Sequence, residues 1–115
     1  MDIQALTVDE IWQEIDRLTE ENPDAIGNLE GIFAFQIKND EVKSYSITLK
    51  DSKADISASL DEHADCILTM NEKNFKKLID GSLNAPAAFM TGKLKVKGNM
   101  GLALKLESAL KKFMK

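Results

Sequence analysis

The sequence predicts an α+β fold in which about four to five helices cover one face of a five-stranded, mostly antiparallel sheet. Three consecutive segments alternate apolar and polar residues, a pattern typical of strands with one polar face. The segments around them repeat apolar residues at helical spacing. Because one sheet face stays polar, helices can cover only the other, which favours α+β over a doubly wound parallel sheet.

Length and composition predict a single domain over residues 1–115. Hydrophobic residues make up 43% of the chain and charged residues 30%, as in ordinary globular proteins. We find no apolar run long enough to span a membrane and no secretory leader. The single cysteine, Cys66, can form no intrachain disulfide. Together these features predict a cytoplasmic protein.

The first predicted helix begins at a capping box formed by Thr7 and Glu10. Apolar residues then recur at helical spacing, and the helix is expected to end near Pro23. Trp12 lies on the apolar side, where it serves either as a core anchor or as a ligand contact. Arg17 is the only arginine. It either pairs with neighbouring acids, Glu14 or Glu21, or meets the charged head group of a ligand.

Four strands and a second helix are expected to follow. Residues 32–38, 42–50 and 54–60 form a three-stranded meander with turns at 39–40 and 51–52. Residues 66–70 form a fourth strand. Asn71 then caps a helix that ends at Gly81, because asparagine is a good N-cap and glycine a good helix terminator.

The segment 81–112 contains a short helix, the fifth strand and a long helix. Asn84 and Pro86 are typical of a helix start, and Gly92 ends that helix. Residues 93–97 alternate lysine with apolar residues, which predicts a half-buried strand. Asn99 is expected to cap a last helix from 100 to about 113.

The last predicted helix carries more apolar surface than one core needs. One face groups most of its apolar residues, namely Leu102, Leu106, Ala109, Leu110 and Phe113. Met100 and Leu104 fall on the opposite side, among charged residues. Either neighbouring loops cover these two side chains, or the helix borders an apolar space as well as the core.

The net charge of −4 conceals a gradient along the chain. Residues 1–30 contain nine acids and one arginine, whereas residues 93–115 contain seven lysines and one glutamate. An acidic protein with one basic end is a poor candidate for nucleic-acid binding. The basic end is either a solvated helix face or a site of transient contact with an anionic membrane surface.

Candidate catalytic groups are few. His63 lies in a polar loop without partners at metal-ligand spacing, and Cys66 lies in a strand beside apolar residues. Residues 92–101 lack the order of a phosphate-binding loop, although N–H groups near Asn99 could bind an anion. We therefore expect no enzyme, no catalytic residue, no metal and no cofactor. A small hydrolase or thioesterase using Cys66 and His63 is the catalytic alternative.

Several motifs resemble those of the sterol carrier protein type 2 family, also called the non-specific lipid-transfer family. They are Gly81-x-Leu83-Asn84, Pro86, Ala88-Phe89 and GKLKVKGNMGLALKL over 92–106, preceded by Ala64-Asp65-Cys66, Thr69-Met70 and Asn74-Phe75-x-x-Leu78. Two features depart from the family pattern. Ala85 separates the usual Asn-Pro pair, and the chain ends in Phe113-Met114-Lys115 instead of a peroxisomal small-Lys-Leu signal.

The resemblance implies an apolar tunnel between sheet and helices that takes up a fatty acid, fatty acyl-CoA, phospholipid or sterol. The expected lipid-binding residues are Trp12, Ile15, Phe33, Phe35, Ile47, Phe75, Phe89, Met90, Met100, Leu102, Leu104, Leu106 and Phe113. Arg17 and Asn99 are the candidates for the head group, and the last helix is expected to act as a movable lid. We expect a monomer or weak dimer. The alternative is an interaction or dimerisation module that presents a lipid-like substrate to a partner enzyme.

Overall fold

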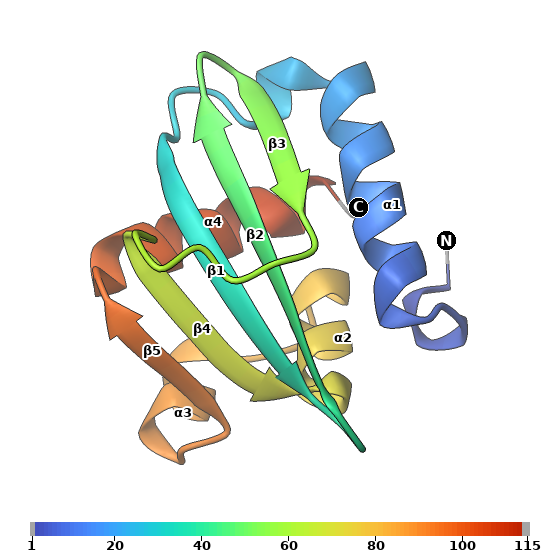
Figure 1. The fold of residues 1–115 in the computed structure, drawn as a ribbon, viewed down its shortest axis with the longest axis vertical. Coiled ribbons are helices and arrows are strands. Elements are labelled where there is room, and N and C mark those ends of the chain that lie inside the picture. Colours follow the sequence, from blue (N-terminus) through green and yellow to red (C-terminus); the bar gives the residue numbers. More distant parts are fainter. Residues whose placement is uncertain (1, 114–115) are drawn as a thin grey trace.

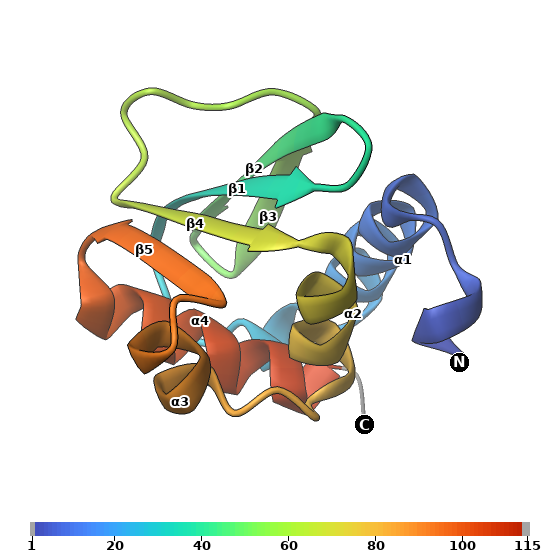
Figure 2. The same cartoon turned by 90° about the horizontal axis from the view of Figure 1, so that it is seen from below.

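The computed structural model describes the backbone of residues 2–113 and the side chains of residues 2–24 and 26–110. A sheet forms one layer and helices form the other (Figure 1 and Figure 2). The strands are β1 (Gly31–Lys38), β2 (Val42–Lys50), β3 (Lys53–Ser57), β4 (Cys66–Asn71) and β5 (Leu94–Gly98). The helices are α1 (Val8–Glu21), α2 (Glu72–Asp80), α3 (Ala85–Met90) and α4 (Met100–Phe113), with short turns η1 (Ile3–Ala5) and η2 (Pro23–Ala25).

The strand order is β3-β2-β1-β4-β5. Neighbouring strands are antiparallel except β1 and β4, which are parallel. The predicted α+β fold with a five-stranded, mostly antiparallel sheet is therefore confirmed. The parallel pair requires a crossover, and residues 58–65 provide it by crossing the sheet face opposite the helices (Figure 1 and Figure 2).

The crossing loop is tied to the sheet by polar groups that the alternation places on this face. The Ser46 hydroxyl donates to the Ser59 carbonyl at 2.6 Å and accepts from the Asp61 N–H at 2.8 Å. The Asp65 carboxylate accepts from the Ile32 N–H at 2.8 Å. The strand predicted over 54–60 was too long, because the chain must leave the sheet edge after Ser57 to reach β4.

The helix boundaries follow local capping signals. Thr7 and Glu10 form the predicted capping box, in which each side chain accepts from the other residue's backbone N–H at 3.0–3.1 Å. The hydrogen bonds from Thr7 hold the pKa of Glu10 below its usual value. The starts of α2, α3 and α4 are each capped by an asparagine that accepts from an N–H three residues on, at Asn71, Asn84 and Asn99.

Four aromatic rings fill the interior between α1, α2 and the sheet. Trp12 stacks against Tyr45 and Phe75 with ring centroids 5.0 and 5.7 Å away, and meets Phe35 edge-on at 5.1 Å. All four side chains are at most 8% exposed. Such ring contacts stabilise a core beyond the area they bury. Trp12 therefore acts as a core anchor, one of the two roles expected for it.

A tight turn joins β5 to α4. Gly98 has a positive φ of 104°, and a Cβ at this position would lie only 2.3 Å from the Asp65 carbonyl oxygen. The Asn99 N–H donates to the same carbonyl at 3.0 Å. Glycine is thus required for the close approach that sets where α4 begins.

Candidate functional site

An apolar cavity of about 220 Å³ lies between the β4–β5 edge of the sheet and helices α2, α3 and α4. Glu107 is the one charged residue in a wall formed otherwise by apolar side chains. The wall consists of Leu68, Leu78, Ala85, Pro86, Phe89, Met90, Leu94, Val96, Met100, Ala103, Leu104, Leu106, Glu107 and Leu110. The arrangement can hold hydrocarbon but offers little to bind a polar group.

The strand side of the wall follows from simple alternation. Leu94 and Val96 face the cavity from β5, whereas Lys95 and Lys97 between and beyond them are exposed. The pairing of β4 with β5 places Leu68 opposite Val96, and both residues line the cavity. The sequence therefore assigned the correct face of this strand to the interior.

Two of the side chains that the helices place at the wall are small. Ala85 begins α3 and Ala103 lies in α4, and both are buried at the wall. Protein interiors are normally close-packed, so unfilled apolar volume of this size is unusual. A largely apolar space of this kind favours apolar ligands.

The cavity opens to solvent beside α3 and α4. Phe89, Met90 and Leu104 are 44%, 85% and 42% exposed, and all three belong to the wall. Among the described side chains, Val42 is the other large hydrophobic that is strongly exposed. Most of the exposed large apolar side chains of the described chain thus gather at this mouth.

The predicted lipid-binding residues divide into two groups. Five of them line the cavity, namely Phe89, Met90, Met100, Leu104 and Leu106. Six lie in the packed core and outside the wall, namely Trp12, Ile15, Phe33, Phe35, Ile47 and Phe75. Leu102 packs partly buried against the core, and the side chain of Phe113 lies outside the described residues. Lipid contact by all of these residues, including the five at the wall, stays a prediction.

Sequence reasoning left open whether a second face of the last helix borders an apolar space, and it did not assign Ala103 or Glu107 to that face. Met100, Ala103, Leu104 and Glu107 are spaced i, i+3, i+4 and i+7, which puts them on one side of α4, and all four line the cavity. Glu107 obscured this pattern because a charged residue is not expected at an apolar wall. The helix therefore borders an apolar space as well as the core, the second of the two possibilities left by the sequence.

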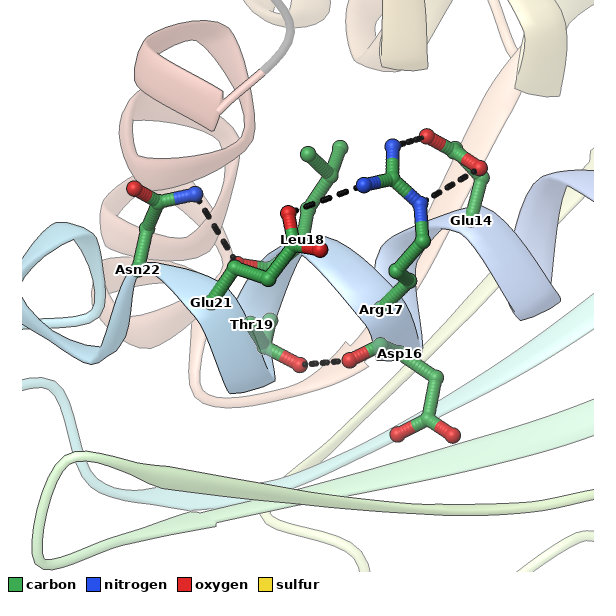
Figure 3. Close-up of polar contacts among 7 residues, drawn as sticks. All are labelled: Glu14, Asp16, Arg17, Leu18, Thr19, Glu21 and Asn22. Carbon is green, nitrogen blue, oxygen red and sulfur yellow. Dashed lines mark hydrogen bonds and ion pairs between the residues drawn. The ribbon is translucent and has the colours of Figure 1, made fainter.

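The head-group candidates lie away from the cavity wall. Arg17 is on the exposed side of α1, where Nη1 donates to the Glu21 carboxylate at 2.8 Å and Nε donates to Glu14 at 3.2 Å (Figure 3). The hydrogen bonds to Glu14 and Glu21 raise the pKa of Arg17, and the hydrogen bond from Arg17 lowers the pKa of Glu14. Asn99 caps α4. Pairing of Arg17 with its neighbours is confirmed, and a ligand role for either residue stays a prediction.

A second, more open hollow of about 690 Å³ lies across α4 from the cavity, against the loop that precedes β1. Its lining mixes apolar groups with the charged residues Asp24, Glu30 and Lys105. Leu104 borders both spaces. The two hollows together place an apolar compartment beside one of mixed polarity.

The chemistry of Cys66 does not suit a nucleophile. The side chain is 0% exposed, and burial, with a smaller effect of the Asp65 charge, raises the pKa of the thiol to about 11. The thiol is therefore protonated at neutral pH, whereas nucleophilic cysteines react as thiolates. His63 is exposed in the crossing loop.

Among the described residues, no group of three or more histidine, cysteine, aspartate or glutamate side chains is arranged to hold a metal ion. In the same part of the chain, no helix combines the length and apolarity needed to cross a bilayer.

Comparison with known proteins gives a consistent result. The SCP-2 sterol transfer family matches residues 12–111 of this chain. Human sterol carrier protein 2 is 36% identical over 102 residues, which cover 85% of this chain and 19% of the human protein. The chain thus spans about a fifth of the length of the curated relatives it matches.

Solved structures share the same fold. Sterol carrier protein 2 from Yarrowia lipolytica, in its apo form, has a TM-score of 0.76 and 30% identity, with 90% of this chain and 89% of that one covered. Sterol carrier protein 2 from Aedes aegypti, in complex with the C16 fatty acid palmitate, has a TM-score of 0.69 and 28% identity. That match covers 92% of this chain and 96% of the Aedes chain.

Proposed function

The chain belongs to the SCP-2 sterol transfer family, and from this premise we propose that residues 1–115 form one domain that binds a long-chain lipid in the apolar cavity. The observation that carries the proposal is the unfilled apolar space beneath α3 and α4, which is open to solvent at one side. The related Aedes protein has been solved with palmitate, which supports a fatty acid or acyl derivative as the ligand class.

Hydrocarbon burial supplies the driving force. A saturated chain of about 16 carbons gains roughly 0.8 kcal/mol per buried CH₂, or about 12 kcal/mol in gross transfer. Association costs of roughly 4–15 kcal/mol offset most of this gain. We therefore expect micromolar to nanomolar affinity, with selection by chain length and bulk more than by polar detail.

The cavity must enlarge to hold such a chain. Its volume of about 220 Å³ is below the roughly 300–1,000 Å³ of typical ligand pockets. We propose that α4 moves away from α3 on loading, which extends the cavity past Leu104 toward the second hollow. The polar end of the lipid would then lie in that hollow, where Lys105 is available to an anionic group.

The proposal is tested by titrating delipidated protein with a fluorescent fatty acid. We expect saturable uptake at micromolar ligand. Ala103→Phe, which fills the cavity, should reduce uptake at least tenfold, whereas Ala58→Phe on the exposed crossing loop should not change it. Circular dichroism and urea unfolding establish that both variants fold. Uptake that survives cavity filling, or an absence of saturable uptake, would contradict the proposal.

We propose that this domain binds and delivers lipid without catalysing a reaction on it. The buried, protonated thiol of Cys66 supports this assignment. The curated relatives are much longer, so such domains also occur within larger proteins. Lipid uptake by a Cys66→Ser variant should equal that of the parent protein. The cytoplasmic location of the protein stays a prediction.

A further inference from the structure

The sheet ends in two edge strands that differ in what lies beside them. β3 forms one edge, and α1 packs beside it (Figure 1). β5 forms the other edge, and Figure 1 shows no described element along its outer side. An edge strand without a neighbour presents backbone N–H and carbonyl groups that can pair with another chain. The outer edge of β5 is therefore open to a further strand.

Lysines follow this open edge. Lys95 and Lys97 lie on the face of β5 that is turned away from the cavity, opposite Thr69 and Ile67 of β4. Lys93 directly precedes the strand. All three lysines are exposed, and within the described part of the chain no ion pair engages them. The edge thus carries positive charge that is available to a partner.

The lysines disfavour a second copy of this chain at the same edge. If two copies paired through β5, Lys95 and Lys97 of one would lie close to those of the other. Like charges opposite each other destabilise a strand pair, and edge lysines commonly prevent such self-association. Opposite charges across a strand pair stabilise it. The edge therefore suits a strand that carries acids.

The helix next to β5 adds an apolar surface. α3 lies beside β5 on the helical side of the sheet (Figure 2). Its last two residues, Phe89 and Met90, are 44% and 85% exposed. Prevention of self-association does not require exposed apolar side chains, whereas a group of them usually marks an interaction site. A strand added to β5 would thus meet lysines on one face and apolar side chains on the other.

We propose that the open edge of β5 binds an extended segment of a partner protein, which adds a strand to the five-stranded sheet. The segment alternates acidic and apolar residues, because side chains along a strand point to opposite faces in turn. Its acids face Lys95 and Lys97, and its apolar residues contact Phe89 and Met90. Backbone hydrogen bonds provide affinity and the two faces provide specificity. The proposal goes beyond lipid binding and holds whether or not the cavity takes up lipid.

The test is the binding of a fluorescent peptide, in which glutamate alternates with valine, to the whole chain. We expect saturable binding in fluorescence anisotropy. The variant Lys95→Glu, Lys97→Glu should bind about tenfold more weakly, because two attractive pairs become repulsive. The matched control Lys38→Glu, Lys50→Glu makes the same change in net charge at exposed positions on β1 and β2, and should bind as the parent does.

Two altered peptides separate strand pairing from general charge attraction. A peptide that alternates lysine with valine should bind the Lys95→Glu, Lys97→Glu variant and should not bind the parent. A glutamate peptide with N-methylated backbone amides keeps its charges but cannot donate hydrogen bonds to β5, so its binding should be lost. Hydrogen exchange of the β5 amides should slow when the unmodified peptide binds, whereas exchange in β3 should not change.

The apolar contribution is tested with a matched pair of exposed side chains. Met90→Ser should weaken peptide binding about threefold, because it removes apolar area that the peptide covers. Val42→Ser, which changes an exposed side chain on β2, should leave binding unchanged. Equal effects of these two substitutions would contradict the assignment of the apolar face.

The outcomes also separate strand addition from lipid binding. The Lys95→Glu, Lys97→Glu variant should take up fatty acid as the parent does, because both side chains lie outside the cavity wall. Fatty-acid uptake without peptide binding would overturn strand addition and leave the proposed function standing, and peptide binding without uptake would do the reverse. Equal loss in both lysine variants, binding that survives N-methylation, or a dimer of the chain alone that protects the β5 amides would also overturn strand addition.

Discussion

The two halves of the apolar interior differ in how they are filled. Beneath α1, the rings of Trp12, Phe35, Tyr45 and Phe75 contact one another with centroids 5.0–6.1 Å apart. Beneath α3 and α4, mostly alanine and aliphatic side chains, with Phe89 and Glu107, enclose about 220 Å³. The same layering of helices on a sheet therefore produces a solid core or a cavity according to side-chain size.

The surfaces over these two halves also differ from each other. The filled half lies under an acidic helix, whereas the hollow half opens beside exposed apolar side chains. The filled half supplies stability, and the hollow half remains available for a ligand. Substitutions in the two halves should accordingly affect different properties.

The largest expected effect is that of removing the anchor of the filled half. Trp12→Ala deletes a side chain that is 3% exposed and breaks three ring contacts. We expect a loss of about 3–5 kcal/mol in the free energy of unfolding, measured by urea denaturation. A loss below about 1 kcal/mol would show that the ring contacts contribute little to the stability of the core.

Cys66 joins the halves, since its strand position pairs with Phe33 on one side and Gly98 on the other. The thiol pKa is raised by burial to about 11, so the folded state keeps its proton while the unfolded state loses it above about pH 8.5. Stability should therefore be fully retained below that pH and fall by about 2–3 kcal/mol as the pH rises toward 11. Urea denaturation at a series of pH values should show this loss of stability in the parent protein and should not show it in the Cys66→Ala variant.

A smaller effect is expected at the turn that positions α4. Gly98→Ala forces a side chain into positive φ and against the Asp65 carbonyl. We expect a cost of about 1–3 kcal/mol and weaker fatty-acid uptake, because the wall residues of α4 shift. Gly92→Ala is the control, since its φ is also positive but a Cβ there meets nothing within 4 Å. Equal uptake by the two variants would contradict a role for the turn in shaping the cavity.

The smallest stability effect should come from the hollow half itself. Leu104→Ala removes a side chain that is 42% exposed and borders the cavity. Few packing contacts are lost, so we expect a change below about 1 kcal/mol in the free energy of unfolding. Uptake of fatty acids should instead shift toward bulkier or longer chains. A large destabilisation with unchanged ligand preference would remove the distinction between the halves.

The positions of the elements could be read from the sequence because their signals are local. The capping box at Thr7, the asparagine caps and the alternation along 93–97 depend only on neighbouring residues. These signals placed all four helices and five strands within a few residues. The exception was the third strand, whose end depends on where the chain must travel next.

Only the tertiary structure decided which apolar residues enclose empty space. Periodicity assigns a side chain to the inner face of an element, but it does not say what packs against it there. Phe35 and Leu94 both alternate inward, yet one meets Trp12 and the other lines the cavity. A void is the volume left between side chains from distant parts of the chain, so its position is set when β4, β5, α3 and α4 come together.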